Sequence, residues 1–372
     1  MKSYYYHRAT SALRIVTLLI SVYISPVGAA VSYNITDLGT LGGSSSYAYG
    51  INNAGQVVGS SYITGNPVQY GRAVQHAFLY SNGSITDLGT LGGSSSYAYG
   101  INNSGQVVGE ASLSGNAGSH AFRYSAGSMA DLGTLGGPNS VAYGINNNGQ
   151  VVGSSSTGGF YAGWYAFLYS NGVMTNLGDF GGGGSSAYGI NTNDQVVGTA
   201  YAVSTIDVNA GTNAFLYSND VMTNLRPLVA SSFAYGINDN GQVVGDAGHA
   251  FLYSNGMWSD LGTLGGFTSS AFGINNNAQV VGSAATPASG NHAFFYNGGS
   301  MLDLNNLIDP GSGWTLTDAR GINDSGQIVG YGNINGQTHA YLLTAVPLPA
   351  AIWLLGSGLI GLMSVTRRRK AA

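Results

Sequence analysis

One stretch, from His76 to Gly109, recurs in recognisable form along most of the chain: HAFLYSNGSITDLGTLGGSSSYAYGINNSGQVVG. Its Gly-Ile-Asn triplet occurs seven times, and each copy is soon followed by Gln-Val-Val-Gly or, at Gln327, by Gln-Ile-Val-Gly. The triplets begin at Gly50, Gly100, Gly144, Gly189, Gly236, Gly273 and Gly321. Self-similarity at spacings of 37 to 50 residues predicts an array of equivalent structural units rather than several unrelated domains.

Each unit contains four short strand candidates separated by tight turns. Gly105 lies in the sequence Asn-Asn-Ser-Gly-Gln, where a left-handed residue closes a hairpin, while Asp194 and Ala278 replace this glycine in two units. Asn82-Gly83 predicts a second hairpin between the aromatic segment and the Asp-Leu-Gly segment. Hairpins on both sides make the strands antiparallel, which argues against a parallel β-helix.

The strands are apolar on both faces. In His-Ala-Phe-Leu-Tyr, Ala77 and Leu79 point one way and Phe78 and Tyr80 the other, so each sheet needs a neighbour on either side. Seven such units predict an all-β fold, a seven-bladed β-propeller of four-stranded antiparallel blades. The first repeat copy begins with an Asp-Leu-Gly strand, 33–39, and the last copy ends with an aromatic strand, 339–344. We expect these two to pair and close the ring, with the Ala-Tyr-Gly-Ile-Asn strand innermost.

The two ends of the chain differ from the repeats. Residues 1–30 have a basic start, an apolar run over 15–24 and small residues before a cleavage site after Ala30, which predicts a secretory signal peptide. Residues 346–372 combine a short motif, an apolar segment over 350–365 and a basic stop that should remain in the cytoplasm. The motif is Val346, Pro347, Leu348 and Pro349, and the basic stop is Arg367, Arg368, Arg369 and Lys370. An ordinary retained anchor is the alternative for the C-terminal segment.

Two resemblances follow from these residues. The C-terminal tail resembles the PEP-CTERM sorting signal of Gram-negative bacteria in its VPLPA-type variant, with Leu348 where the commoner motif has Glu. The resemblance implies processing by an exosortase, a transient membrane helix, a cell-surface or extracellular location and an association with exopolysaccharide and biofilm. Residues 33–344 resemble the HAF-type extracellular repeat, named for triplets such as His76-Ala77-Phe78. That second resemblance implies no particular activity.

Composition restricts the chemistry. The chain has no Cys, which excludes disulfides, thiolate metal sites and Cys nucleophiles. Between the two ends lie four Arg and all 15 acidic residues, a formal charge of −11, so a nucleic-acid partner is not expected. Five of the seven aromatic segments begin at a His, for which we expect a structural role at a strand end rather than metal binding. The repeated Asp residues are expected to bond local backbone amides.

No catalytic, metal-binding or cofactor-binding residue is predicted. Glu110 is the only Glu, and the nucleophile and zinc motifs Gly-x-Ser-x-Gly and His-Glu-x-x-His are absent. The Asn-Asn-x-Gly turns lack the alternating carboxylates of a calcium loop, which leaves calcium elsewhere on the acidic surface open.

Segments that depart from the repeat are a better guide to a binding site than the residues that recur in every unit. Three long connections, 60–75, 154–164 and 199–213, hold aromatic residues suited to stacking on sugars. These candidates are Tyr62, Tyr70, Phe160, Tyr161, Trp164 and Tyr201. We therefore expect an exported, non-enzymatic binding or adhesion protein. The alternatives are a polysaccharide lyase or glycosidase that uses channel carboxylates, and a purely structural surface protein.

Overall fold

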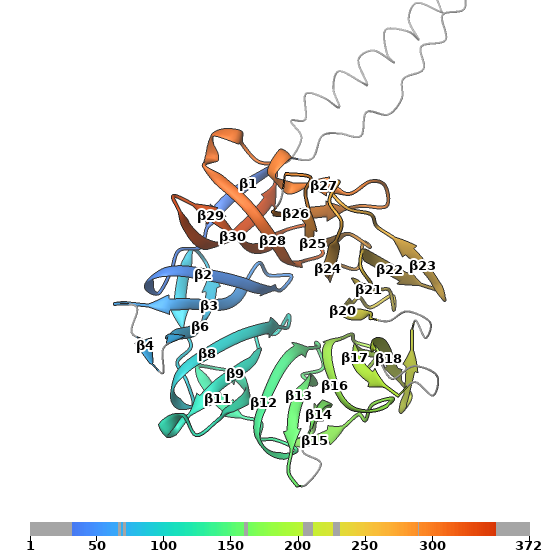
Figure 1. The fold of residues 1–372 in the computed structure, drawn as a ribbon. Helices are drawn as coiled ribbons and strands as arrows, with labels where there is room; N and C mark the ends of the chain where they lie inside the picture. The colour runs from blue at the N-terminus through green and yellow to red at the C-terminus, as the bar shows by residue number, and fades with distance from the viewer. Residues whose placement is uncertain are drawn as a thin grey trace, which may run out of the picture. The chain divides into compact units, whose positions relative to one another are not determined.

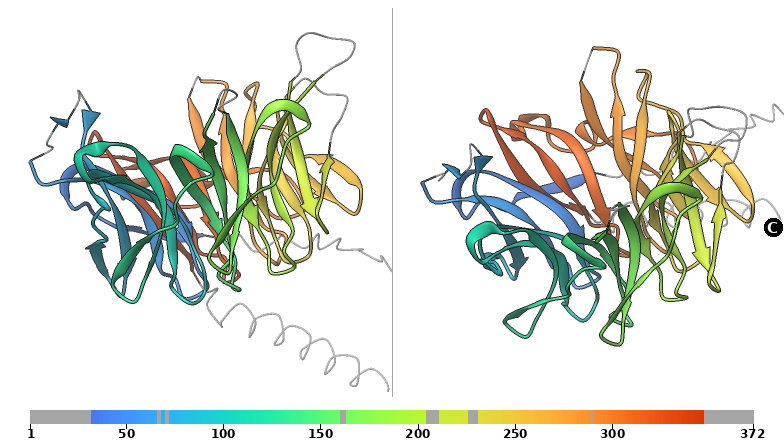
Figure 2. Two further views of the ribbon diagram at one scale, coloured as in Figure 1. Left: turned by 90° about the horizontal axis from the view of Figure 1, so that it is seen from below. Right: turned by 60° about the horizontal axis from the view of Figure 1, so that its bottom comes forward.

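The computed structural model describes residues 32–65, 68–69, 72–159, 163–203, 211–225, 231–288 and 290–346. Residues 32–346 form a ring of seven four-stranded antiparallel sheets around a central axis (Figures 1 and 2). The predicted seven-bladed β-propeller is confirmed. The sequence-derived signal peptide with its cleavage site at Ala30, and the sorting segment from Pro347, Leu348 and Pro349 to the basic stop, lie outside the described residues.

Blades 1 to 6 each run from the innermost to the outermost strand in chain order. Blade 1 contains β2 (Gly42–Ile51), β3 (Val57–Ile63), β6 (Gln75–Ser81) and β7 (Ser84–Asp87). Blade 2 contains β8 (Gly92–Ile101), β9 (Val107–Leu113), β10 (Ser119–Ser125) and β11 (Ser128–Asp131). Blade 3 contains β12 (Gly136–Ile145), β13 (Val151–Thr157), β14 (Trp164–Ser170) and β15 (Val173–Asn176).

The second half of the ring follows the same order. Blade 4 contains β16 (Gly181–Ile190), β17 (Val196–Ala202), β18 (Thr212–Ser218) and β19 (Val221–Asn224). Blade 5 contains β20 (Phe233–Ile237), β21 (Val243–Asp246), β22 (Ala250–Ser254) and β23 (Met257–Asp260). Blade 6 contains β24 (Ser269–Ile274), β25 (Val280–Ala285), β26 (Asn291–Tyr296) and β27 (Leu302–Asp303).

Blade 7 closes the ring. It contains β28 (Trp314–Ile322), β29 (Ile328–Ile334) and β30 (Gln337–Ala345), and its outermost strand is β1 (Tyr33–Asp37) from the other end of the chain. The antiparallel register pairs Tyr33 with Ala345 and Asp37 with Tyr341. The backbone N–H of Val346 donates to the carbonyl of Ser32 at 2.8 Å. The predicted closure is therefore confirmed, with strand limits shifted by one or two residues.

The remaining elements are short. The ribbon β4 (Val68–Gln69) with β5 (Arg72–Ala73) lies between β3 and β6, and three 3₁₀ turns are η1 (Ser114–Asn116), η2 (Leu304–Asn306) and η3 (Pro310–Ser312). None of the helical segments among the described residues is long and apolar enough to span a membrane. The connections predicted as long loops are shorter than expected, because β3, β13 and β17 continue through residues 63, 157 and 202.

The turns behave as their residue types predict. Gly105 has φ of 76°, and Asp194 and Ala278, which replace it in two units, adopt the same left-handed conformation at 61° and 59°. The outer hairpin turn has Asn82 at 50° and Gly83 at 80°, the two positive φ values of a type I′ turn. Local turn chemistry thus sets the antiparallel order of each blade.

The core lies between the blades. Phe78 packs with Ala48 and Val57 of its own blade and with residues of blade 7, whereas its neighbour Ala77 packs toward Ala98 of blade 2. Both side chains are fully buried. The alternation of the strand therefore buries one face against each adjacent blade, as the two-faced apolar pattern predicts.

A ring of seven asparagines joins the innermost strands at one end of the channel. Asn102 donates from Nδ2 to the backbone carbonyl of Asn146 in the next blade at 3.0 Å, and the same contact repeats in each blade until Asn323 donates to Asn52. The ring consists of Asn52, Asn102, Asn146, Asn191, Asn238, Asn275 and Asn323. The third residue of every Gly-Ile-Asn triplet is thus a circumferential link.

Candidate functional site

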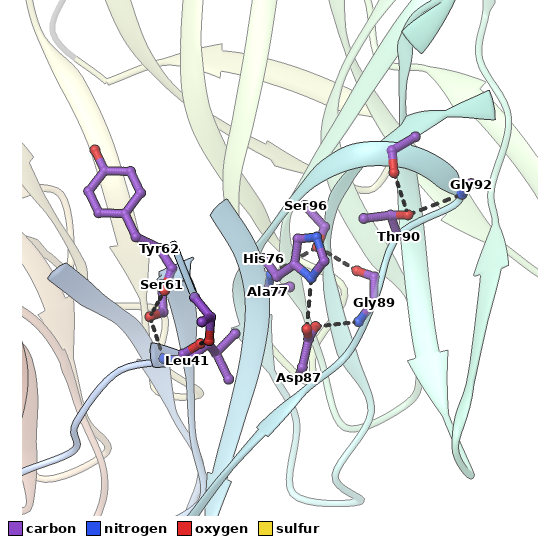
Figure 3. Close-up of polar contacts among 12 residues, drawn as sticks. Leu41, Ser61, Tyr62, His76, Ala77, Asp87, Gly89, Thr90, Gly92 and Ser96 are labelled. Carbon is purple, nitrogen blue, oxygen red and sulfur yellow. Dashed lines mark hydrogen bonds and ion pairs between the residues drawn. The ribbon is translucent and has the colours of Figure 1, made fainter. Parts of the chain in front are cut away.

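The repeated histidines lie within hydrogen-bonding distance of aspartates in their own blades. Nδ1 of His76 lies 2.7 Å from Oδ2 of Asp87, whose Oδ1 accepts from the backbone N–H of Gly89 at 2.8 Å (Figure 3). The hydrogen bond to Asp87 is the main cause that raises the pKa of His76. Burial works to raise the pKa of Asp87, but the hydrogen bonds from His76 and Gly89 outweigh it and lower that pKa. Each pair joins the third strand of a blade to the end of the fourth.

The same arrangement occurs in all five blades that have the His, which confirms the structural role predicted for His and Asp. The pairs are His76–Asp87, His120–Asp131, His249–Asp260, His292–Asp303 and His339–Asp37. We did not predict the pairing itself. The signal was present in the sequence, because the two units that lack the His, at Tyr165 and Asn213, also have Asn in place of the Asp.

A circle of aromatic side chains surrounds the channel above the asparagine ring. Consecutive rings have centroids 5.1 to 5.5 Å apart, and the six members are Tyr49, Tyr99, Tyr143, Tyr188, Tyr235 and Phe272. Arg320 occupies the seventh position, with its guanidinium carbon 4.0 Å from the centroid of Phe272. Burial raises the pKa of Tyr49 to about 12.

Three carboxyl groups lie near this circle. Glu110 accepts a hydrogen bond from Tyr99 at 3.1 Å, and burial raises its pKa. Burial also raises the pKa of Asp246 and of Asp318, although hydrogen bonds oppose the shift at Asp246 and the Arg320 guanidinium opposes it at Asp318. The three belong to blades 2, 5 and 7. Within the described part of the chain, no three His, Asp or Glu side chains come close enough together to hold a metal ion.

Two of the predicted aromatic candidates line one groove. Trp164 begins β14 in blade 3, and Tyr201 lies near the end of β17 in blade 4; their side chains are 43% and 51% exposed. Both border a groove of about 370 Å³ that also contains Thr199, Thr212 and Phe233. The groove lies at the end of the strands opposite the asparagine ring. No charged residue is found among its described lining residues.

The groove exists because the repeat changes there. The innermost strand of blade 2 reads Gly-Gly-Ser-Ser-Ser-Tyr from Gly92, whereas blade 4 reads Gly-Gly-Gly-Gly-Ser-Ser from Gly181. Gly184 has the Tyr201 ring within 3.0 Å of where a Cβ would lie, so a larger side chain would push that ring away. Ser186 replaces Tyr97 and removes a second large ring. Small residues on β16 thus make room beside Trp164 and Tyr201.

The other predicted aromatics do not join this groove. Tyr62 lies half-buried on β3 in blade 1, where its backbone pairs with Gln75. Tyr70, Phe160 and Tyr161 lie outside the described residues, as do Pro347, Leu348 and Pro349 of the sorting motif. Val346, the first residue of that motif, directly follows β30.

Comparison with known proteins adds little. No family model and no curated protein matches the chain. A Trypanosoma rangeli sialidase is 11% identical with a TM-score of 0.36; the match covers 71% of this chain but only 55% of the sialidase. The Aleuria aurantia lectin AAL, in complex with Fucα1-6GlcNAc, is 11% identical with a TM-score of 0.36, covering 84% of this chain and 99% of the lectin. At this level the similarities carry no argument about the site.

Proposed function

We propose that the protein is a non-enzymatic, carbohydrate-binding module that acts outside the cell. The observation that carries the proposal is the groove that presents Trp164 and Tyr201 together. Aromatic rings offer flat apolar surface for the faces of a sugar ring, and Thr199, Thr212 and Ser186 supply hydroxyl groups for its edges. The groove is open to solvent and bears no charge among its described residues, which suits a neutral polyhydroxylated ligand.

Binding to a glycan array tests this proposal directly. The full chain, purified in mild detergent, is expected to bind at least one neutral glycan, and Trp164→Ala or Tyr201→Ala is expected to weaken that binding. Phe267→Ala is the matched control, because Phe267 is 94% exposed but lies outside this groove. Equal loss in the control, or no loss in either groove variant, would exclude this groove as the binding site.

We further propose that the chain is exported and sorted as its two ends predict. The resemblance of residues 346–372 to a PEP-CTERM signal supports exosortase processing, and the resemblance of 33–344 to HAF-type repeats supports an extracellular location. Association with exopolysaccharide or biofilm matches the proposed ligand. Mass spectrometry of the surface-associated protein checks this: a mature chain that starts after Ala30 and lacks the basic stop is expected. Retention of Arg367 to Lys370 in that protein would argue for a permanent anchor.

A further inference from the structure

The groove beside Tyr201 has an equivalent two blades further round the ring. The second groove has a volume of about 310 Å³ and lies between blade 6 and the innermost strands of blade 7. Most of its lining residues, though not Arg320 and Tyr331, occupy the same repeat positions as lining residues of the first groove. The corresponding pairs are Ser186 and Ser270, Tyr188 and Phe272, Thr199 and Ser283, Thr212 and Asn291, and Phe233 and Asp318.

The chemistry of the second groove is different from that of the first. Ala285 stands at the position of Tyr201, so the stacking ring is missing. Asp318 stands at the position of the Phe233 ring, and Arg320 replaces the tyrosine that the Gly-Ile-Asn strand carries in five other blades. A carboxylate, a guanidinium, the Tyr331 hydroxyl and the Asn291 amide therefore meet in one place.

The guanidinium of Arg320 is held in place while part of it stays unpaired. Its Nη2 donates to Oδ1 of Asp318 at 2.9 Å and to the hydroxyl of Tyr331 at 2.8 Å, and its plane lies against Phe272. The described residues give hydrogen-bond partners to Nη2 alone among its three nitrogens, and Nε is fully buried. A side chain fixed in this way loses little conformational entropy when Nη1 donates to a ligand.

A pair of neighbouring sugar hydroxyls matches this arrangement. One hydroxyl can accept from Nη1 of Arg320 while the other donates to the Asp318 carboxylate, and both contacts are charge-assisted hydrogen bonds. An acidic sugar fits less well, because Asp318 already neutralises Arg320 and Asp246 accepts a hydrogen bond from Ser270 at the same groove. The local balance of charge is therefore unfavourable for a second carboxylate.

We infer that this groove, with Asp318, Arg320, Tyr331 and Asn291, is a second binding site that recognises the hydroxyl groups of a neutral sugar. The inference rests on the proposed function for the nature of the ligand, but its residues are independent of Trp164 and Tyr201. A long neutral polysaccharide would be bound at both grooves, and the second contact raises the apparent affinity through effective concentration.

The test is affinity electrophoresis of the full chain in mild detergent through gels that contain dextran, galactomannan or polygalacturonate. The key variant combines Asp318→Ser with Arg320→Tyr. It recreates the Ser-Ala-Tyr-Gly-Ile sequence of 186–190, which the fold already accommodates in blade 4. Glu110→Ser is the matched control: it also removes a half-buried carboxyl and introduces the residue that blade 1 has at the equivalent position, Ser60, but it lies in blade 2.

We expect a neutral polymer to retard the wild-type chain and polygalacturonate not to do so. The double variant should weaken the apparent affinity about tenfold, as the loss of charge-assisted hydrogen bonds predicts, while Glu110→Ser leaves it unchanged. Wild-type retardation in the double variant, with loss in Trp164→Ala, would overturn this inference and leave the proposed function standing. Stronger retardation by polygalacturonate would overturn the predicted neutral ligand. Retardation by none of the three polymers would count against both proposals.

Discussion

Removing the side chain of one member of the asparagine ring should lower the free energy of unfolding substantially. The Asn102 side chain is 3% exposed and makes four hydrogen bonds. Nδ2 donates to Oε1 of Gln106 at 2.8 Å and to the carbonyl of Asn146 at 3.0 Å, and Oδ1 accepts from the backbone N–H groups of Ser104 and Gln106 at 3.1 and 2.9 Å. At about 1 kcal/mol for each net hydrogen bond, Asn102→Ala should lower the free energy of unfolding by about 4 kcal/mol.

The adjacent residue provides a matched control. Asn103 has the same side chain in the same turn but is exposed, and its Oδ1 accepts one hydrogen bond, from the backbone N–H of Asn53 at 3.0 Å. Asn103→Ala should therefore cost about 1 kcal/mol or less. A third variant, Asn102→Asp, keeps one acceptor oxygen but places a buried carboxylate oxygen against the carbonyl of Asn146, so it should cost at least as much as Asn102→Ala near neutral pH.

Guanidinium chloride unfolding followed by circular dichroism measures all three variants. We expect the loss in free energy of unfolding for Asn102→Ala to exceed that for Asn103→Ala by several kcal/mol, while the slope of that free energy against denaturant stays unchanged. Equal midpoints for the two alanine variants would refute it and would mean that the ring of hydrogen bonds contributes no net stability. A changed slope would instead mean that the blades no longer unfold together.

Three further predictions concern closure, pH and packing. Thr36→Pro removes the backbone donor that faces Leu342 across the closing pair of β1 and β30 and should cost about 1 to 3 kcal/mol, seen as faster proteolysis of blade 7; proteolysis at the wild-type rate would speak against closure by this strand. The His76–Asp87 pair should stabilise the fold fully only between two pH limits. Above the ordinary His pKa of about 6.5, the stabilisation is lost as pH rises through the raised pKa of His76. Below about 3.8, the ordinary Asp pKa, it is lost as pH falls through the lowered pKa of Asp87. Replacing both by Asn should therefore cost most between these values in thermal melts across pH, and a uniform cost at every pH would contradict the assignment. Gly109→Ala places a Cβ against the carbonyl oxygen of Tyr97 and should destabilise the blade by more than about 3 kcal/mol. Denaturant titrations measure this loss. A variant as stable as wild type would show that the two strands can move apart at this position.

The fold could be predicted because the same turn residues and the same apolar strand pattern recur in seven units. Turn residues such as Asn82-Gly83 specify hairpins, and the two-faced pattern of Ala77 and Phe78 requires a neighbour on each side of every sheet. The repeats begin with an Asp-Leu-Gly strand and end with the aromatic strand that normally pairs with it, and this arrangement predicts the closure of the ring.

The candidate site was only partly predictable. Trp164 and Tyr201 were recognisable as departures from the repeat, but they are 37 residues apart and meet only because the third strand of one blade packs on the first strand of the next. The role of Gly184 and Ser186 in opening the groove depends on that packing. The seventh position of the aromatic circle shows the same limit: Arg320 is visibly unusual in the sequence, but its contact with Phe272 crosses a blade boundary and its contact with Tyr331 joins two strands of blade 7.

The closing strand also affects how such a chain can lengthen. The boundary of the sequence repeat lies in the middle of a blade, so a tandem duplication of one 50-residue unit adds the outer half of one blade and the inner half of the next. Both halves find partners already present, and the seam between β1 and β30 is untouched. The identity of residues 35–53 and 85–103 is the expected trace of such an event.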